Sequence, residues 1–426
     1  MTRSYMATHD LIAVSANTKE TAINTEQTLD TTMLCALGDI INMEHRRESN
    51  ENEATGKEEP DTVYDLGALT NASFNFEKAQ PQHFAFLLAY ALGSPSVAAA
   101  GSGHVHTIVP ITGDLDGQRS LPSFTAAQRY GNNVMRRRFA SMFVDSISAS
   151  FAKDAWCKIT GTIKGTGKVT TNVVEEVVSA AGNVTTLTLA ALGVEGADAP
   201  TRLQNVQRIR VELATGVWTE VAFTAVSAAA PAAITIVAPA VAATVVNFRV
   251  LYIPTEAGWM TFPARINETP LRVSEMTLKV GGAWSGSAFA GGRNLQAEVK
   301  SIDWSFNNNL AVEFVPGGGG AYASRAIRGG RTQKLTLNRE FREFIMQQHL
   351  VANDTLGLYI LAEGAIYDTP HKYQVEIIFP KVAVLSAPIS ADGKRLGEAG
   401  DLQVLEDDTY GSVIVKIKNL QATYAA

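Results

Sequence analysis

"SFNFEKAQPQHFAFLLAYALG" (residues 73–93) sets the local plan of the chain. Phe74 and Phe76 alternate with polar neighbours, which predicts a strand with one apolar face. Pro81 suits the first turn of a helix, and Gly93 suits its end. The helix has one apolar stripe at i, i+3, i+4 and i+7, formed by Phe84, Leu87, Leu88 and Ala91. We therefore expect a strand that leads into a short helix packed on a core.

The same plan recurs near the other end of the chain. "KLTLN" (334–338) alternates like a strand, Asn338 can cap a helix, and "REFREFIMQQHL" (339–350) follows. The expected stripe of this second helix is Phe341, Phe344 and Ile345. Repetition of a unit within one chain predicts a duplicated architecture.

Most of the remaining chain reads as strands. "HKYQVEIIFPKV" (371–382) has an apolar face from Tyr373 to Phe379 and is expected to stop at Pro380. Further strands are predicted at 31–43, 104–111, 121–130, 142–152, 155–163, 271–280, 295–306, 310–315, 331–337, 356–361, 382–386 and 411–419. The fold class is therefore mainly β, with two sandwich or barrel domains that each hold a short helix.

Composition divides the chain into four parts. Residues 1–30 are polar without periodicity and predict a flexible N-terminal arm. Residues 31–165 form a first domain and 263–426 a second. Between them, 166–262 is rich in Ala, Val and Thr, with short strands and frequent breaks, which predicts a small all-β insert.

The charge of the chain argues against several classes of protein. Of 426 residues, 46% are apolar and 18% charged, and the net charge is −6, so bulk electrostatics do not favour nucleic-acid binding. No stretch reaches the length of a membrane helix and no signal peptide is evident. Two distant cysteines, Cys35 and Cys157, indicate a reducing compartment and core positions.

The sequence holds no convincing catalytic or metal motif. His104 and His106 share a strand face at a metal-ligand spacing, but a third ligand is missing, so we interpret them as exposed polar residues. "GGGG" (317–320) lacks the Lys-Ser/Thr of a phosphate loop and predicts a hairpin tip. The adjacent acids 406–408 do not have the convergent geometry of catalytic carboxylates. We expect no enzyme activity and no cofactor.

Two charged segments are candidate contact surfaces. "EHRRESNENEATGKEEPD" (44–61) has seven acids and three bases and no large apolar residue, so it is either a solvated loop or a contact arm. The arm hypothesis assigns contacts to Glu51, Glu53, Glu58, Glu59 and Asp61. "SRAIRGGR" (324–331) is either a solvated hairpin or a basic loop that receives the acidic arm of another copy through Arg325, Arg328 and Arg331.

A β-sandwich with so little helix leaves sheet edges open. Open edges aggregate unless they are protected or paired. If both halves of the chain are such units, pairing between copies closes the sheet into a ring, and closure is what removes edges altogether.

These segments together resemble a known family, the tail tube proteins (major tail proteins) of long-tailed bacteriophages. The resemblance rests on the loose strand, helix and turn patterns of these stretches: "TVYDLGALTNASFNFEKAQPQHFAFLLAYALGS" (62–94), "SLPSFTAAQRYG" (120–131), "FVDSISASFAKDAWCKITGTIKG" (143–165), "VKSIDWSFNNNL" (299–310), "QKLTLNREFREFI" (333–345), "YQVEIIFPKV" (373–382) and "YGSVIVKIKN" (410–419). It covers about residues 30–165 and 270–420, and the insert falls outside it.

The resemblance implies a structural virion protein. Such proteins stack as rings around a channel for genome delivery, with an acidic lumen and long loops that hook adjacent rings, and 44–61 matches the hooking loop in position. The implied partners are further copies of the chain, the tape-measure protein and other tail proteins, while DNA passes without specific binding. The implied location is the virion tail, assembled in the host cytoplasm. The duplication favours a trimer of pseudo-sixfold symmetry over a hexamer.

Three other readings stay open from the sequence. A distal tail or terminator-like ring would share the fold without polymerising. A host-surface binding module would use exposed aromatic residues on the insert, where Trp218 is the candidate. An enzyme would need a convergent polar cluster that the sequence does not show.

Overall fold

The computed structural model describes residues 6–131, 135–239, 244–255, 260–295, 298–318 and 320–426. The first five residues of the predicted arm, Gly319 of the predicted glycine tip and two short stretches of the insert (240–243 and 256–259) lie outside the described residues. The fold is mainly β, as predicted. The chain divides into two compact units: Met1–Leu11, Ala127–Arg138 and Val169–Phe262 form the smaller one, and Ile12–Ala126, Phe139–Lys168 and Pro263–Ala426 form the larger.

The smaller unit has its own core between two sheets. The four-stranded sheet has the order β11 (Val174–Ala181), β17 (Val245–Tyr252), β13 (Val206–Ala214) and β14 (Val217–Glu220). The three-stranded sheet has the order β12 (Thr186–Thr188), β16 (Ala233–Ile236) and β15 (Phe223–Val226). Inward side chains such as Ile209, Ile234 and Phe248 are buried between them. Asp198 caps the single helix α3 (Ala199–Asn205) by accepting the Thr201 N–H at 2.7 Å. The unit also contains η1 (Ala7–His9) and β10 (Val169–Thr171).

The first layer of the larger unit is a continuous antiparallel sheet of eight strands. Its order is β3 (Asn42–Ser49), β4 (Val63–Phe76), β9 (Lys158–Gly165), β8 (Arg136–Ala152), β21 (Val299–Asn307), β24 (Thr332–Glu340), β28 (Arg395–Val404) and β27 (Ile389–Asp392). Within the described residues β3 pairs only with β4 and β27 only with β28, so each of these two strands has one unpaired edge. Next to β27, the end of β26 also pairs with β28, from Val382 to Ser386, and joins the two layers.

The second layer is a shorter antiparallel sheet. Its order is β5 (Ser96–Ala100), β6 (Gly103–Ile108), β29 (Ile414–Asn419), β26 (His371–Ser386), β25 (Thr355–Asp368) and β18 (Met276–Trp284), with β19 (Phe289–Ala290) and β20 (Arg293–Asn294) beside β18. The remaining elements of the chain are β1 (Leu11–Val14), β2 (Thr31–Met33), β7 (Phe124–Arg129), β22 (Leu310–Glu313), β23 (Arg325–Arg328), α2 (Asp116–Arg119) and η2 (Val273–Glu275).

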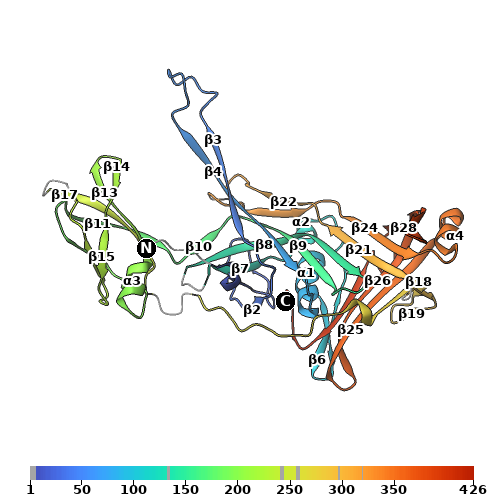
Figure 1. The fold of residues 1–426 in the computed structure, drawn as a ribbon. Helices are drawn as coiled ribbons and strands as arrows, with labels where there is room; N and C mark the ends of the chain where they lie inside the picture. Colours follow the sequence, from blue (N-terminus) through green and yellow to red (C-terminus); the bar gives the residue numbers. More distant parts are fainter. Residues whose placement is uncertain (1–5, 132–134, 240–243, 256–259, 296–297, 319) are drawn as a thin grey trace. The chain divides into compact units, whose positions relative to one another are not determined.

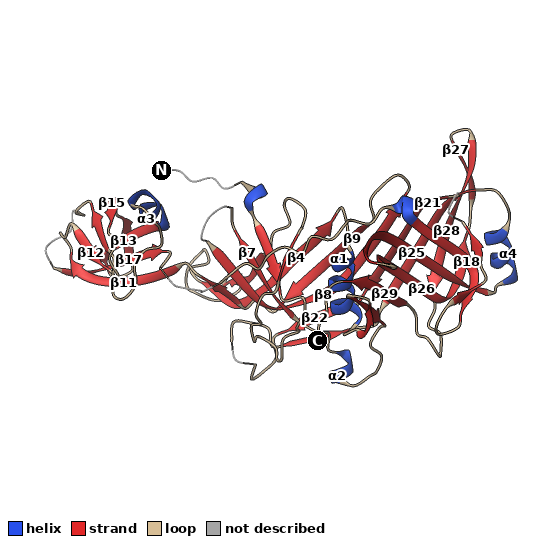
Figure 2. Ribbon diagram, turned by 90° about the horizontal axis from the view of Figure 1, so that it is seen from below, coloured by secondary structure: helices blue, strands red, loops and turns tan. Residues whose placement is uncertain are grey.

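The two layers enclose helix α1 (Pro81–Leu92), which contacts β9 on one side and β6, β26 and β29 on the other (Figures 1 and 2). The predicted bounds of this helix are confirmed: Pro81 lies in its first turn and Gly93 follows it. All twelve of its residues are buried, so the helix is covered on every side rather than along one stripe. The predicted inward residues of β8 and β9, among them Phe151 and Ile163, are also buried.

The first layer consists of two groups of strands with the same order. We call β3, β4, β9 and β8 with α1 the first block, and β21, β24, β28 and β27 with α4 (Ile345–Ala352) the second block. In each block the second strand leads into the helix, and a helix side chain lies over a glycine of the third strand: Leu87 near Gly161, and Met346 near Gly400. The blocks meet where β8 pairs with β21, from Ser146 opposite Asn307 to Ala152 opposite Ser301.

Three local predictions are wrong. Pro380 does not end its strand, because β26 continues to Ser386; the register of β25 on β26 shifts there, and such a bulge tolerates a residue without an N–H. The second helix begins at Ile345 rather than 339, since β24 continues through Glu340, and Phe344 is exposed. Residues 11–16 are not part of a flexible arm: β1 pairs with β2, and the side chains from Ile12 to Ala16 are buried.

Candidate functional site

One face of the first layer is lined by small polar side chains. Register pairs place Asn75, Thr160, Ser148, Ser305 and Lys334 in one row across five strands. Neighbouring rows are similar, and the side chains of this hydroxyl face include Asn71, Ser73, Asn75, Lys158, Thr160, Thr162, Lys164, Ser146, Ser148, Ser150, Asp303, Ser305, Asn307, Thr332, Lys334 and Thr336. The opposite face is the apolar core, with Phe74, Ile147 and Trp304 fully buried.

The charges at the hydroxyl face lie in opposite pairs. Lys164 Nζ is 2.9 Å from Asp145, Lys158 Nζ is 2.5 Å from Glu77, and Lys334 Nζ is 3.5 Å from Asp401. Asp303 accepts a hydrogen bond from Ser150 at 2.5 Å. The surface is therefore close to neutral rather than acidic. A polyanion gains affinity by exchanging counterions for basic side chains, and lysines already paired with carboxylates offer little of that gain.

The acidic segment 44–61 forms the end of a long hairpin, β3–β4, that extends from the first layer (Figure 1). We call residues 50–62 the acidic tip. Asn50 organises it: its Nδ2 donates to Asp61 Oδ1 at 2.7 Å, and its Oδ1 accepts the N–H groups of Asp61 and Thr62. Hydrogen bonds from Lys57 and Asn50 lower the pKa of Asp61. The tip is therefore a turn closed by its own hydrogen bonds.

The predicted contact acids differ in their surroundings. Glu51, Glu53, Glu58 and Glu59 are exposed, and Glu53 also accepts a hydrogen bond from the Tyr64 hydroxyl at 2.8 Å. Asp61 belongs to the internal hydrogen bonds of the tip, so its carboxylate is already engaged.

The predicted basic loop does not present three arginines. Arg328 is buried, and its Nη2 donates to the carbonyls of Ile111 and Gly113 at 3.2 and 3.3 Å. Arg331 also donates to the Ile111 carbonyl, and burial lowers its pKa to about 10. Arg325 alone of the three is exposed, 3.8 Å from Glu313. The glycines around Arg328 suggested a solvated hairpin, but this residue lies in strand β23.

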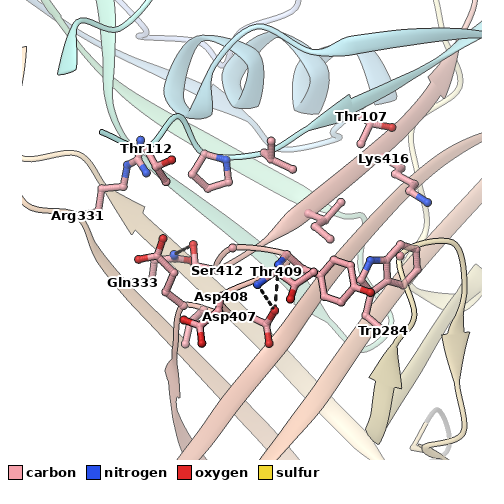
Figure 3. A pocket seen from close by; sticks show the side chains of 18 of the residues that line it. Thr107, Thr112, Trp284, Arg331, Gln333, Asp407, Asp408, Thr409, Ser412 and Lys416 are labelled. Carbon is pink, nitrogen blue, oxygen red and sulfur yellow. Dashed lines mark hydrogen bonds between the residues drawn. The ribbon is translucent and has the colours of Figure 1, made fainter. Parts of the chain in front are cut away.

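A groove of about 730 Å³ lies at the end of the second block (Figure 3). Its walls are the start of β24, the end of β28, the turn 406–412 and part of β29, together with the segment 107–112 at the end of β6 and residues 284–286 at the end of β18. Arg331 lies at one end and Lys416 at the other, where Lys416 Nζ is 4.4 Å from the centre of the Trp284 ring. Asp407 accepts the N–H groups of Thr409 and Tyr410 and holds the turn.

The histidine pair has no metal-site geometry. His106 is fully buried rather than exposed as expected, and its Nε2 contacts the Gln421 carbonyl oxygen at 2.9 Å. Burial lowers the pKa of His106. Within the described ranges no group of three or more His, Cys, Asp or Glu side chains is placed to hold a metal ion.

The two cysteines and the insert tryptophan are buried or half-buried side chains. Cys157 is buried, which raises its pKa to about 12, and Cys35 is half-buried. Trp218 is half-buried on the outer face of the four-stranded sheet, with the Arg249 guanidinium 4.3 Å from its ring centre. One face of that ring is thus covered by a cation, which leaves less of it for stacking on a sugar.

Comparison with other proteins adds no relative. Neither the known family models nor the curated proteins include a match to this chain. Among the helices that the structure describes, none has the length and apolar character needed to cross a membrane.

Proposed function

We propose that this chain is a self-assembling structural protein whose copies join edge to edge into rings, and that the stacked rings form the tail tube of a long-tailed bacteriophage. The observation that carries the proposal is the joint between the two blocks. Within one chain β8 of the first block pairs with β21 of the second, while β3 and β27, which occupy the corresponding ends, have no described partner beyond their own block.

The repeated order supplies a rule for adding copies. β27 corresponds to β8 and β3 corresponds to β21, so β27 of one copy would pair antiparallel with β3 of the next. Such pairing satisfies the backbone groups of both edges. Because each chain carries two blocks, three chains would give a ring of six, and we therefore favour a trimer. A ring without edges is also protected from uncontrolled aggregation.

The hydroxyl face supports a channel role. In the proposed ring the apolar face is occupied by the second layer, which leaves the hydroxyl face for the lumen. Its paired charges suit the passage of DNA and a tape-measure protein without specific binding. The proposal requires neither cofactor nor catalytic residue, and it places the protein in the virion tail after assembly in the host cytoplasm.

The proposal is tested by blocking one edge. Proline removes an N–H, and N–H groups of successive residues in an edge strand alternate between the partner strand and the free edge. In Ser390→Pro and Ala391→Pro, one variant loses an N–H toward β28 and the other loses one toward the free edge. The variant that loses an N–H toward the free edge should stay folded but monomeric under conditions in which the parent protein forms rings. Sedimentation velocity of both variants measures this.

Three results would contradict the proposal. If every folded β27 variant assembles like the parent, β27 is not a ring contact. If the parent forms only single rings that never stack, the result would favour a distal tail or terminator-like ring over a tail tube. A parent that stays monomeric and binds host cells would favour the surface-binding module instead.

A further inference from the structure

Each block carries a hairpin arm at the same position. In the first block the arm connects β3 to β4 through the acidic tip, and in the second block it connects β21 to β24 through β22 and β23. Both arms begin with an asparagine that directly follows the first strand and is buried: Asn50 and Asn308. We call these arms the acidic arm and the second arm.

The second arm lies across the ends of the first block in the same chain. Near β8, Leu310 and Ala326 pack with Phe143 and Leu121. At the end of β9, the Ala323 N–H donates to the Thr166 carbonyl at 3.0 Å.

The same arm then reaches β4 and β3. The Ala68 N–H of β4 donates to the Ala321 carbonyl at 3.0 Å, and the Arg46 guanidinium of β3 lies 5.7 Å from the Phe314 ring centre. The second arm therefore covers the strand ends of the preceding block, one after another.

The corresponding strand ends of the second block border the groove. In the first block, Thr70 opposite Gly165 is the pair at the end of β9. In the second block, Leu335 is opposite Leu402, which lies two residues before the end of β28. By this register the positions equivalent to Ala68 and Thr166 are Arg331 and Leu405. Arg331 lines the groove, and Leu405 lies between its lining residues Val404 and Glu406. The groove thus lies where the first block receives an arm.

We infer that the groove at the end of the second block receives the acidic arm of a neighbouring copy in the same ring. The inference rests on the proposed edge pairing, because that pairing brings β3 of the neighbour beside β27. It assigns the arm a lateral contact, whereas the family resemblance alone implied a hook between rings.

Charge gives the docking a direction. The acidic tip presents Glu51, Glu58 and Glu59. The groove is lined by Arg331 and Lys416 together with the acids of the turn 406–408, and Arg325 on β23 is exposed outside this lining. The second arm reaches beyond β4 to β3, and an acidic arm that followed the same path would reach beyond β24 to the base of β22–β23. Opposite charges at that point would fix the register of the arm more than its affinity.

The experiment places a photo-crosslinking amino acid, benzoylphenylalanine, at position 59 of the full chain. Rings assembled from a mixture of ¹⁴N- and ¹⁵N-labelled chains are irradiated, digested and analysed by mass spectrometry. The expected crosslinks join position 59 to peptides within 325–333 or 403–412, and they carry mixed isotopes because they link different copies. The same probe at position 275, an exposed acid outside the arm, is the matched control and should give none of these crosslinks.

A charge exchange supplies a second readout. Glu58→Arg with Glu59→Arg should lower the assembled fraction about tenfold, and adding Arg325→Glu should restore most of it. Crosslinks from position 59 to other peptides, in chains that still form rings, overturn the inference and leave the proposed function standing. Failure of the unmodified chain to form rings overturns the proposed function itself.

Discussion

Asn308 Nδ2 donates a 2.8 Å hydrogen bond to the carbonyl of Ala91, and this contact ties the second block to the helix of the first. The same nitrogen lies 3.4 Å from the Val144 carbonyl on β8. Ala91 lies in the last turn of α1, where carbonyls lack intrahelical partners. The joint between the blocks therefore satisfies a helix end as well as a strand edge.

Replacing Asn308 by Ala should destabilise the larger unit. The change leaves buried carbonyls without a donor, which costs about 1–3 kcal/mol. Urea unfolding followed by tryptophan fluorescence measures the loss. Asn71→Ala, which removes an exposed hydrogen bond to Glu44, is the control and should change stability by less than about 0.5 kcal/mol. Equal effects of the two variants would contradict the importance of the joint.

The contact of helix α1 with the first layer depends on Gly161. A Cβ at this position would lie 2.5 Å from Leu87 Cδ2, and Leu87 is fully buried. Gly161→Ala should therefore cost about 1–3 kcal/mol by overpacking. Gly330→Ala, where nothing lies within 4 Å of the added atom, should cost nothing measurable in the same unfolding experiment. An unchanged urea midpoint for Gly161→Ala would show that α1 can move away from this position without a loss of stability.

A buried ion-pair network anchors β24 to β28. Arg339 Nη2 is 2.6 Å from Glu398 and its Nη1 is 3.1 Å from Glu298, and all three side chains are buried. Arg339→Met would leave Glu398 without its cation and Glu298 with Arg293 alone, and it should cost about 3–5 kcal/mol. Lys158→Met breaks the exposed pair with Glu77 and should cost at most about 1 kcal/mol. Similar costs for both would mean that water reaches the buried network.

Stability should fall as pH rises toward neutrality because of Glu268. Burial raises the pKa of this carboxyl from its ordinary value of 4.5 to about 7, while the Gln82 N–H donates to it at 2.8 Å. Tyr373 and Tyr424 are the titratable groups whose pKa values respond to its charge. The folded state keeps a proton that the unfolded state releases, so stability is fully present below about pH 4.5 and is lost as pH rises through about 7.

The size of that effect is bounded by the shift itself, at about 3 kcal/mol. Thermal melts between pH 4.5 and 8 of the parent and of Glu268→Gln measure it. The parent should lose stability relative to the variant over this range. If the stability of the parent and of Glu268→Gln changed in parallel between pH 4.5 and 8, Glu268 would not keep its proton in the folded state over this range.

The insert should be dispensable for assembly. Val174 and Tyr252 are directly opposite on neighbouring strands, so the chain leaves and returns at one point. Replacing 174–252 by a short Gly-Ser linker should leave the larger unit folded and able to assemble, as judged by sedimentation. A folded deletion variant that stays monomeric would make the insert part of the ring wall.

The sequence predicted local structure well where one pattern acted alone. Helix α1 has a proline start, a glycine end and an apolar stripe, and no competing signal. Around Pro380 two signals competed, and the alternation of β26 prevailed because a bulge accommodates the missing N–H. Phe341 and Phe344 have helical spacing, yet β24 extends through Glu340 because its pairing with β28 continues to Gly397.

The site was less predictable because its elements depend on distant contacts. Arg328 and Arg331 look solvated in sequence, but carbonyls of the 111–113 loop, more than two hundred residues away, bind their guanidinium groups. Nothing local distinguishes Asn50 or Asn308 from other loop asparagines. The hydroxyl face was visible only as alternation in single strands, and the register between strands was needed to join them into one surface.

Electron microscopy of the purified protein over a concentration series is the experiment to do first. We expect rings that stack into hollow tubes as concentration rises, with three chains and six blocks around each ring. Monomers at every concentration, in a protein shown to be folded, would contradict the claim that β27 and β3 pair between copies.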